Sequence, residues 1–213
     1  MIVLNPSFEI LNGSFGIDVL KLIELAGRTC YKSEDKITDK SSVNFVKSLI
    51  KSGHHSVIEH SGMTVKFVCD RGVSHELVRH RLASFSQEST RYANYSKDKF
   101  GREITVIKPL FWEEGSDEYN LWFRSMEDAE RSYMDLIDKG CRPEEARTVL
   151  PNSLKTEIVV TANIREWRHI LDLRCSKSAH PQIRQIMLNL LDYLNDESSV
   201  LFNDLWVKHN DRI

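Results

Sequence analysis

The most informative part of this chain is the stretch Arg79-His80-Arg81-Leu82-Ala83-Ser84-Phe85-Ser86-Gln87-Glu88-Ser89-Thr90-Arg91. It holds three arginines, one histidine and three serines, and only three of its side chains are aliphatic or aromatic. The whole chain has a formal net charge of −2, so a local gathering of cations indicates that an anion lies against them. Arginine forks suit phosphates and the planar edges of bases. The stretch therefore predicts a ligand site rather than a piece of core.

Length and composition favour one domain with a proper core, since the chain has 213 residues and 41% hydrophobic content. Its 29 basic and 31 acidic residues create no overall basic field, so neither nucleic acid nor a membrane surface is expected as a partner. The four cysteines lie far apart, and the N-terminus shows no secretory segment. No apolar run approaches the ~20 residues of a membrane span. We expect a cytoplasmic protein in a reducing compartment.

Hydrophobic periodicity predicts both helices and strands. Helical spacing occurs at residues 17–29, 43–50, 116–139, 163–174, 181–194 and 200–206, with a short helix between Pro143 and Pro151. Alternating or β-branched segments predict strands at residues 63–69, 104–107 and 156–161. These strands are too few and too separated for a Rossmann sheet. We expect a single α+β domain over residues 1–213, with a small, mostly antiparallel sheet flanked by helices.

The predicted helix 163–174 has two faces at 100° per residue. Its apolar side carries Ile164, Trp167, Ile170 and Leu171, and its polar side carries Arg165, Arg168, His169 and Asp172. Arg174 falls in the middle of the apolar side. Because an unpaired buried charge is costly, either the helix frays before Arg174, or the side chain snorkels out, or the guanidinium faces a partner or a cavity.

A second helix is expected just before the signature stretch, started by Asp70 or Ser74. Its inner face would carry Val73, Leu77, His80 and Arg81 at i, i+4, i+7 and i+8, and so change from apolar to cationic. Two readings of this face are open. His80 and Arg81 either meet a ligand or form ion pairs with acids elsewhere in the chain.

Metal and thiol chemistry are not predicted. His54, His55, Glu59 and His60 are competent ligand types, but their spacing is not that of a zinc helix and no cysteine pair assists, so we expect no metal site. None of the four cysteines stands in a setting that activates a thiol. Cys175 follows Arg174, yet a small buried hydrophobic residue is the better interpretation.

Arg-His-Arg, seven further residues, Ser, any residue and Arg is the signature of the flavin-dependent thymidylate synthases, and this chain resembles that family at residues 79–91. Two further segments are similar: Gly53-His54-His55-Ser56 with a later Glu-His, and Asn163-x-Arg165 with His169. The resemblance implies an enzyme that methylates dUMP to dTMP. Methylenetetrahydrofolate would give the carbon, and NADPH would give reducing equivalents through FAD. Family members are homotetramers whose sites draw residues from several subunits.

The resemblance also implies roles for single residues. It assigns to FAD His54, Ser56, Arg79, His80, Arg81, Gln87, Asn163, Ile164, Arg165 and His169. It assigns to dUMP Glu76, Arg79, Gln87, Glu88, Ser89, Thr90, Arg91, Arg147 and Arg174. Arg91 is expected near the phosphate. Arg174 is the expected catalytic residue, stabilising negative charge on the N3 side of the uracil.

Two features of the sequence refine these assignments of single residues. None of the nine glycines forms a Gly-x-Gly-x-x-Gly loop, so arginine and histidine side chains must hold the diphosphate. Glu76 stands where many members of the family carry Gln, and Gln87 where some carry Glu, which suggests a compensating exchange.

Two other functions stay open: a flavin enzyme that adds a hydroxymethyl group to a pyrimidine nucleotide, and a non-catalytic nucleotide-binding or RNA-binding module that stacks bases on Phe85, Tyr92 and Tyr95.

Overall fold

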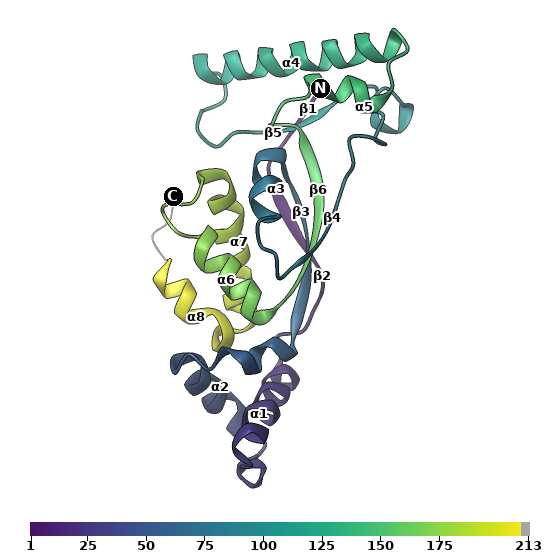
Figure 1. Ribbon diagram of the computed structural model, residues 1–213. Coiled ribbons are helices and arrows are strands. Elements are labelled where there is room, and N and C mark those ends of the chain that lie inside the picture. The colour runs from purple at the N-terminus through teal and green to yellow at the C-terminus, as the bar shows by residue number, and fades with distance from the viewer. Residues whose placement is uncertain (210–213) are drawn as a thin grey trace. The chain divides into compact units, whose positions relative to one another are not determined.

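The computed structural model describes residues 1–209 and has the expected α+β architecture (Figure 1). The helices are α1 (Ile17–Tyr31), α2 (Ser41–Lys51), α3 (Arg71–Leu77), α4 (Asp117–Asp138), α5 (Pro143–Ala146), α6 (Ile164–Arg174), α7 (Pro181–Glu197) and α8 (Ser199–Lys208). The strands are β1 (Ile2–Leu4), β2 (Ser7–Gly13), β3 (Gly62–Asp70), β4 (Ser84–Gln87), β5 (Thr105–Ile107) and β6 (Lys155–Asn163). An antiparallel sheet has the order β2-β3-β6-β4, and β1 pairs with β5 in parallel. No helix of the described residues is long and apolar enough to cross a membrane.

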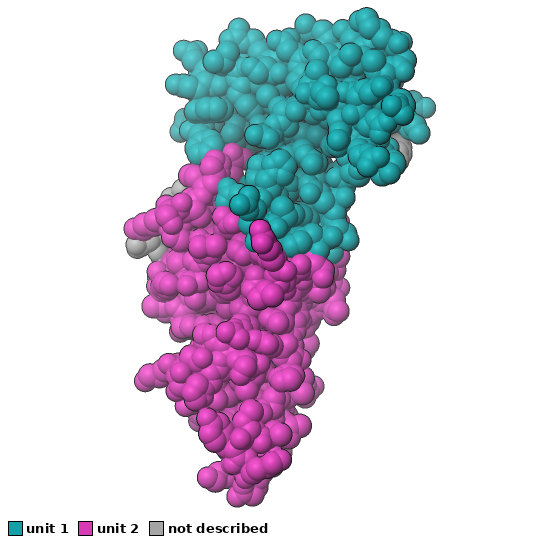
Figure 2. Space-filling model, viewed as in Figure 1, with its two compact units in different colours: residues 1–7, 67–79, 85–159 teal, residues 8–66, 80–84, 160–213 magenta. Residues whose placement is uncertain are grey.

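The chain divides into two compact units, which Figure 2 shows in different colours. Unit 1 contains residues 1–7, 67–79 and 85–159, and unit 2 contains residues 8–66, 80–84 and 160–213. Strands β3 and β6 each begin in one unit and end in the other. No linker therefore separates the units along these strands, and the expected single domain stays a prediction.

Unit 1 is built on an aromatic core under α4. Its buried side chains are Tyr95, Ile104, Val106, Tyr119, Trp122, Met126, Tyr133, Ala146 and Leu154. Helix α4 begins where the Ser116 hydroxyl accepts the backbone N–H of Tyr119 at 3.2 Å. The Trp122 indole donates from Nε1 to Ser153 Oγ at 3.1 Å. Tyr95 belongs to this core, which fixes the chain just beyond the signature stretch.

In unit 2, helix α6 is buried on most of its circumference. Trp167 is fully buried and donates from Nε1 to the carbonyl of Met63 at 3.0 Å. Arg168 was expected on the polar side, and that expectation is wrong: it is buried and forms a bidentate pair with Asp204 of α8, at 2.8 Å from Nη1 and 2.5 Å from Nη2. The helix continues through Arg174, so the expected alternative of fraying is also wrong.

A close backbone approach fixes the start of α6. A Cβ atom added at Gly62 would lie 2.6 Å from the carbonyl oxygen of Ala162, a distance that ordinary side chains do not tolerate. The N–H of Ile164 donates to the carbonyl of Ser61 at 2.8 Å. Only glycine lets β3 come this near to the end of β6. The sheet thereby sets where the helix begins.

Several sequence expectations about elements need correction. The helix expected to carry His80 and Arg81 ends at Leu77, so the predicted cationic inner face does not form. Strands β1, β2 and β4 were not predicted, because each is short or carries polar residues at many positions. The other predicted helices and strands occur, with ends that move by a few residues.

Candidate functional site

Helix α6 presents most of the functional side chains of unit 2, and Asn163 starts it. The Asn163 side chain accepts the backbone N–H of Glu166 at 2.9 Å in the usual manner of a helix N-cap. Asparagine closes the first turn here because its short amide reaches back to the helix. The cap fixes the directions in which Arg165, His169 and Arg174 leave the helix.

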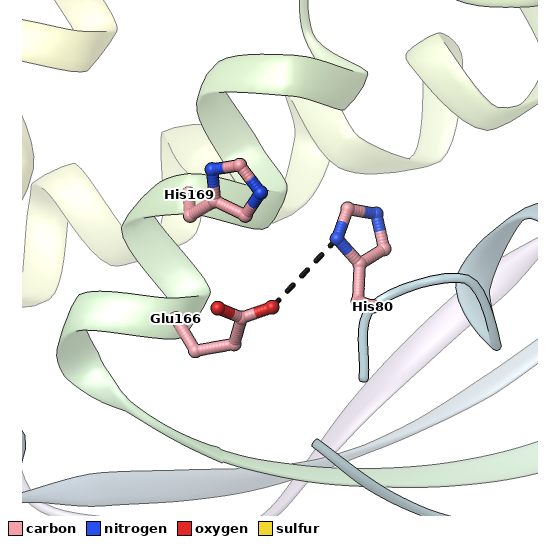
Figure 3. A group of neighbouring side chains, drawn as sticks. All are labelled: His80, Glu166 and His169. Carbon is pink, nitrogen blue, oxygen red and sulfur yellow. Dashed lines mark ion pairs between the residues drawn. The ribbon is translucent and has the colours of Figure 1, made fainter. Parts of the chain in front are cut away.

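His80 and Arg174 form the central contact of the site. Nε–H of Arg174 donates to Nε2 of His80 at 3.0 Å, across 94 residues of sequence. Nδ1 of His80 lies 3.8 Å from a carboxylate oxygen of Glu166, and the His169 ring approaches the His80 ring edge-on at 5.8 Å (Figure 3). His80 is only 5% exposed, while Arg79 and Arg81 beside it are exposed. The Arg-His-Arg motif therefore has one buried histidine between two exposed arginines.

The imidazole of His80 is held neutral. Burial, as the largest cause, together with the cation of Arg174 and the ring of His169 lowers its pKa from 6.5 to about 4. A neutral imidazole has one N–H and one acceptor nitrogen. Here Nε2 is the acceptor, because Arg174 donates to it.

A groove of about 830 Å³ runs along α6 in unit 2. Its lining residues include Asn163, Arg165, Glu166, His169 and Lys208. A second cavity of about 410 Å³ is lined by His54 and Ser56 and shares His55 and Arg165 with the first. Arg165 also pairs with Glu59 at 2.6 Å. The structure thus brings together five of the residues that the resemblance assigns to FAD: His54, Ser56, Asn163, Arg165 and His169.

These two cavities fit a flavin dinucleotide by size and by donor chemistry. Their volumes are in the range of pockets for large organic ligands. Arg165 and Lys208 are exposed cations that would meet a diphosphate in exchange for their ion pairs with Glu59 (2.6 Å) and Asp172 (2.7 Å). The histidine rings offer flat surfaces and hydrogen-bonding nitrogens. Ile164 contributes no side chain to either lining because it is fully buried.

His80, Glu166 and His169 are also metal-ligand types, and their nearest ligand atoms all lie within 4.8 Å of one another. This is a different group from the histidines at 54, 55 and 60 that sequence spacing drew attention to. Arg174 already uses Nε2 of His80, and its guanidinium places a positive charge beside the group. The arrangement therefore suits a planar organic ligand better than a cation.

In unit 1, the second half of the signature stretch is held by side-chain hydrogen bonds. The Gln87 amide donates to the hydroxyls of Ser74 (2.9 Å) and Thr156 (3.2 Å), which ties β4 to α3 and β6. The Glu88 carboxylate accepts from the Tyr95 hydroxyl and from Lys155, each at 3.2 Å. The hydrogen bonds of Gln87 and Glu88 therefore connect this part of the stretch to other segments of unit 1. Tyr95 is buried, so its expected use as a stacking platform for RNA bases is wrong.

Four of the residues that the resemblance assigns to dUMP, Ser89, Thr90, Arg91 and Arg147, lie near one another in unit 1. Nη1 of Arg147 donates to the hydroxyl of Thr90 at 3.3 Å, and the Ser89 hydroxyl accepts the backbone N–H of Arg91 at 3.3 Å. Arg91 lies 3.7 Å from Glu144 and over the Tyr92 ring at 5.5 Å. This cluster offers two guanidinium groups and two hydroxyls. Glu76, which is half-buried, and Arg79, which is exposed, belong to the same unit.

Sequence reasoning missed Glu166. It precedes Ile170 by four residues, so it lies near the apolar side of α6, and it is 6% exposed. That spacing was available as a signal, because an acidic residue beside a buried helix face needs a partner. Asp204, the partner of Arg168, gave no comparable signal since it lies 36 residues away.

Comparison with known proteins gives a consistent picture. The profile of a family described as "Thymidylate synthase complementing protein" matches residues 17–198. The flavin-dependent thymidylate synthase of Corynebacterium aurimucosum is 33% identical over 204 residues, covering 87% of this chain and 80% of that protein. The chain belongs to the flavin-dependent thymidylate synthase family.

Another member of the flavin-dependent thymidylate synthase family, from Geobacter sulfurreducens, is 34% identical over 189 residues, covering 85% of this chain and 80% of the relative. Among solved structures, the UMP/dUMP methylase PolB from Streptomyces cacaoi, bound with 5-Br dUMP, superposes with a TM-score of 0.79. It covers 98% of this chain and 97% of its own, at 23% sequence identity. That likeness establishes the fold.

Proposed function

We propose that this chain converts dUMP to dTMP, with methylenetetrahydrofolate as carbon donor and NADPH as the source of reducing equivalents through FAD. Membership in the flavin-dependent thymidylate synthase family makes it an FAD-dependent enzyme of thymidylate synthesis. The observation that supports the assignment of Arg174 to dUMP is its hydrogen bond to His80, since it joins the signature stretch to α6, which carries the Asn163-x-Arg165 segment.

The side chains of unit 2 have roles that their chemistry supports. Arg165, His169 and the residues at 54 and 56 hold FAD in the cavities along α6. Bound FAD supplies the hydride chemistry of the reaction. Arg174 directs its guanidinium at the N3 and carbonyl edge of the uracil, where negative charge grows as the ring is activated.

The cluster in unit 1 is the proposed phosphate site for dUMP. Arg91 and Arg147 supply guanidinium groups, and Ser89 and Thr90 supply hydroxyls within the same hydrogen-bonded group. A phosphate favours bidentate arginine contacts. Gln87 and Glu88 directly precede this cluster in the chain, and their hydrogen bonds to Ser74, Thr156 and Lys155 help to hold it in place.

The first experiment is a visible absorption spectrum of the purified protein, followed by mass analysis of the product made from dUMP, methylenetetrahydrofolate and NADPH. We expect a yellow flavoprotein and a product with the mass of dTMP. A hydroxymethyl product would assign the other flavin chemistry, and a colourless protein that binds RNA would assign the non-catalytic module. Either result contradicts the proposal.

Arg174 provides a sharper test. A donor aimed at developing charge contributes roughly 10²–10³ in rate, so Arg174→Ala should keep its FAD and lose about that factor in single-turnover methylation at saturating dUMP. Arg174→Lys should recover only part of the loss, because lysine has no planar fork. Arg131→Ala, which removes an exposed arginine of α4, is the control and should retain the full rate. A rate for Arg174→Ala within a few-fold of wild type would show that Arg174 is only a structural ion-pair residue.

A further inference from the structure

Glu166 is a buried carboxylate with one ionic contact. Its side chain is 8% exposed, and in residues 1–209 the group that pairs with it is Nδ1 of His80, at 3.8 Å. A buried carboxylate is costly unless a positive charge or an N–H dipole faces it. The backbone of Glu166 is committed to the Asn163 cap, which holds the residue at this place on α6. Figure 3 shows its carboxylate directed at the His80 ring.

The hydrogen bond from Arg174 shows which tautomer of His80 is present. Arg174 has no acceptor nitrogen, so Nε2 of His80 must carry a lone pair where Nε–H of Arg174 meets it. The neutral ring then bears its proton on Nδ1, and this N–H faces Glu166. At 3.8 Å the contact is an attraction between a charge and a dipole rather than a full hydrogen bond. His169 approaches the ring edge-on and makes no ionic contact with the carboxylate.

We propose that Glu166 is a positioning residue, which keeps His80 in its Nδ1–H tautomer so that Nε2 accepts from Arg174 and fixes the plane of the guanidinium. Glu166 contacts His80, and His80 in turn accepts from Arg174. All three residues lie in unit 2. Its catalytic consequence rests on the proposed function, because that function places Arg174 at the uracil. Its structural consequence, the tautomer of His80, does not depend on any substrate.

The tautomer can be read directly by nitrogen NMR. Protein labelled with ¹⁵N-histidine should show Nδ1 of His80 as a protonated nitrogen and Nε2 as an unprotonated one at neutral pH, with the signals assigned by their loss in His80→Gln. In Glu166→Leu, which replaces the carboxylate with an apolar group, the two shifts should move toward each other as Nε2–H becomes populated. A wild-type His80 with its proton on Nε2, or unchanged shifts in Glu166→Leu, would overturn the proposal.

Kinetics supply the second readout. Loss of the outer partner of a metal-ligating histidine typically costs 10–100-fold. We expect an effect at the lower end of that range here, so single-turnover methylation by Glu166→Leu should fall by about tenfold while FAD stays bound. Glu166→Gln should lose less, because its amide oxygen still turns a partial negative charge toward Nδ1–H. An equal loss in the Gln and Leu variants would contradict the proposal. If wild type makes no dTMP, the proposed function fails, and the NMR comparison still decides on Glu166.

Glu24→Gln is the matched control. Glu24 is a fully buried carboxylate of α1 in the same unit, paired with Arg28 at 2.7 Å, and it lines neither cavity of the site. Its neutralisation tests the general effect of removing a buried charge. We expect Glu24→Gln to leave the His80 shifts and the methylation rate at wild-type values. A shift of the His80 signals in this control would show that the NMR change reports on general loosening and not on Glu166.

Discussion

At the scale of single residues, His80 should make stability depend on pH. Its pKa falls from the ordinary 6.5 to about 4 on folding, so the unfolded chain binds more protons between these values. Stability therefore rises with pH across this window, and it is lost as pH falls from about 6.5 toward 4. The loss should be about 3 kcal/mol for this one group. Urea unfolding at a series of pH values should show a shallower acid slope for His80→Gln, and an identical slope would contradict the assignment.

The cysteines should be dispensable for the chemistry. Burial raises the pKa of both Cys69 and Cys175 to about 12, which leaves almost no thiolate at neutral pH. Cys30 is exposed and lines the cavity of His54 and Ser56. Cys141 is half-buried. Replacing all four with alanine should therefore leave dTMP formation measurable in a folded protein that binds FAD. Complete loss of turnover in such a protein would show that a thiol takes part.

At the scale of elements, the start of α6 separates structural from ligand-binding roles of Asn163. Asn163→Ala removes the cap on Glu166 and should cost about 1 kcal/mol of unfolding free energy. Asn163→Ser keeps a capping oxygen and should recover that stability. If Asn163 also contacts FAD, titration should show that Asn163→Ser binds FAD more weakly than wild type although its stability is restored. Ser116→Ala, which removes the cap of α4, is the control and should lower stability without changing FAD affinity. An Asn163→Ala variant as stable as wild type would contradict the capping role.

The helices were predictable to the extent that their signals are local. Helix α6 has a capping residue, a regular apolar face and eleven residues, so periodicity found it. Helix α3 is different. Asp70, one of its two expected starts, caps it at 2.7 Å. Nothing in the sequence marks its end at Leu77, and the helical spacing of Val73, Leu77, His80 and Arg81 favoured an extension. Strand β4 has four residues and alternates half-buried with exposed positions, which periodicity alone does not distinguish from a loop.

At the scale of the whole molecule, the sequence named most candidate residues but not their partners. Arg174 was recognised as misplaced on an apolar helix face, and the structure supplies His80 as the group it needed. Glu166 was missed, and Arg168 was placed on the polar side of its helix. Their partners, His80 and Asp204, are distant in sequence. Tertiary contacts of this kind carry no periodic signal. The family signature names candidate site residues by fixed spacing, and such spacing reflects tertiary contacts indirectly.

The distribution of candidates between the units bears on assembly. Arg91, Arg147 and Arg79 belong to unit 1, while His80, Arg165 and Arg174 belong to unit 2. One 213-residue chain has limited surface with which to enclose both a dinucleotide and a nucleotide. Large exposed apolar side chains also occur in or beside the signature stretch: Leu82 is 79% exposed and Tyr92 is 78% exposed. Such side chains favour contact with another copy of the chain or with a ligand.

We therefore predict a homotetramer whose sites combine residues from different subunits. Arg79→Ala and Arg174→Ala should each have strongly reduced activity alone, and chains of the two variants that reassemble together should regain part of the dTMP-forming activity. The gain arises because some mixed sites receive Arg79 from one subunit and Arg174 from another. Each variant mixed with more of itself is the control and should gain nothing. A fully active monomer by light scattering at the assay concentration would refute composite sites, since both arginines would then serve one site from one chain.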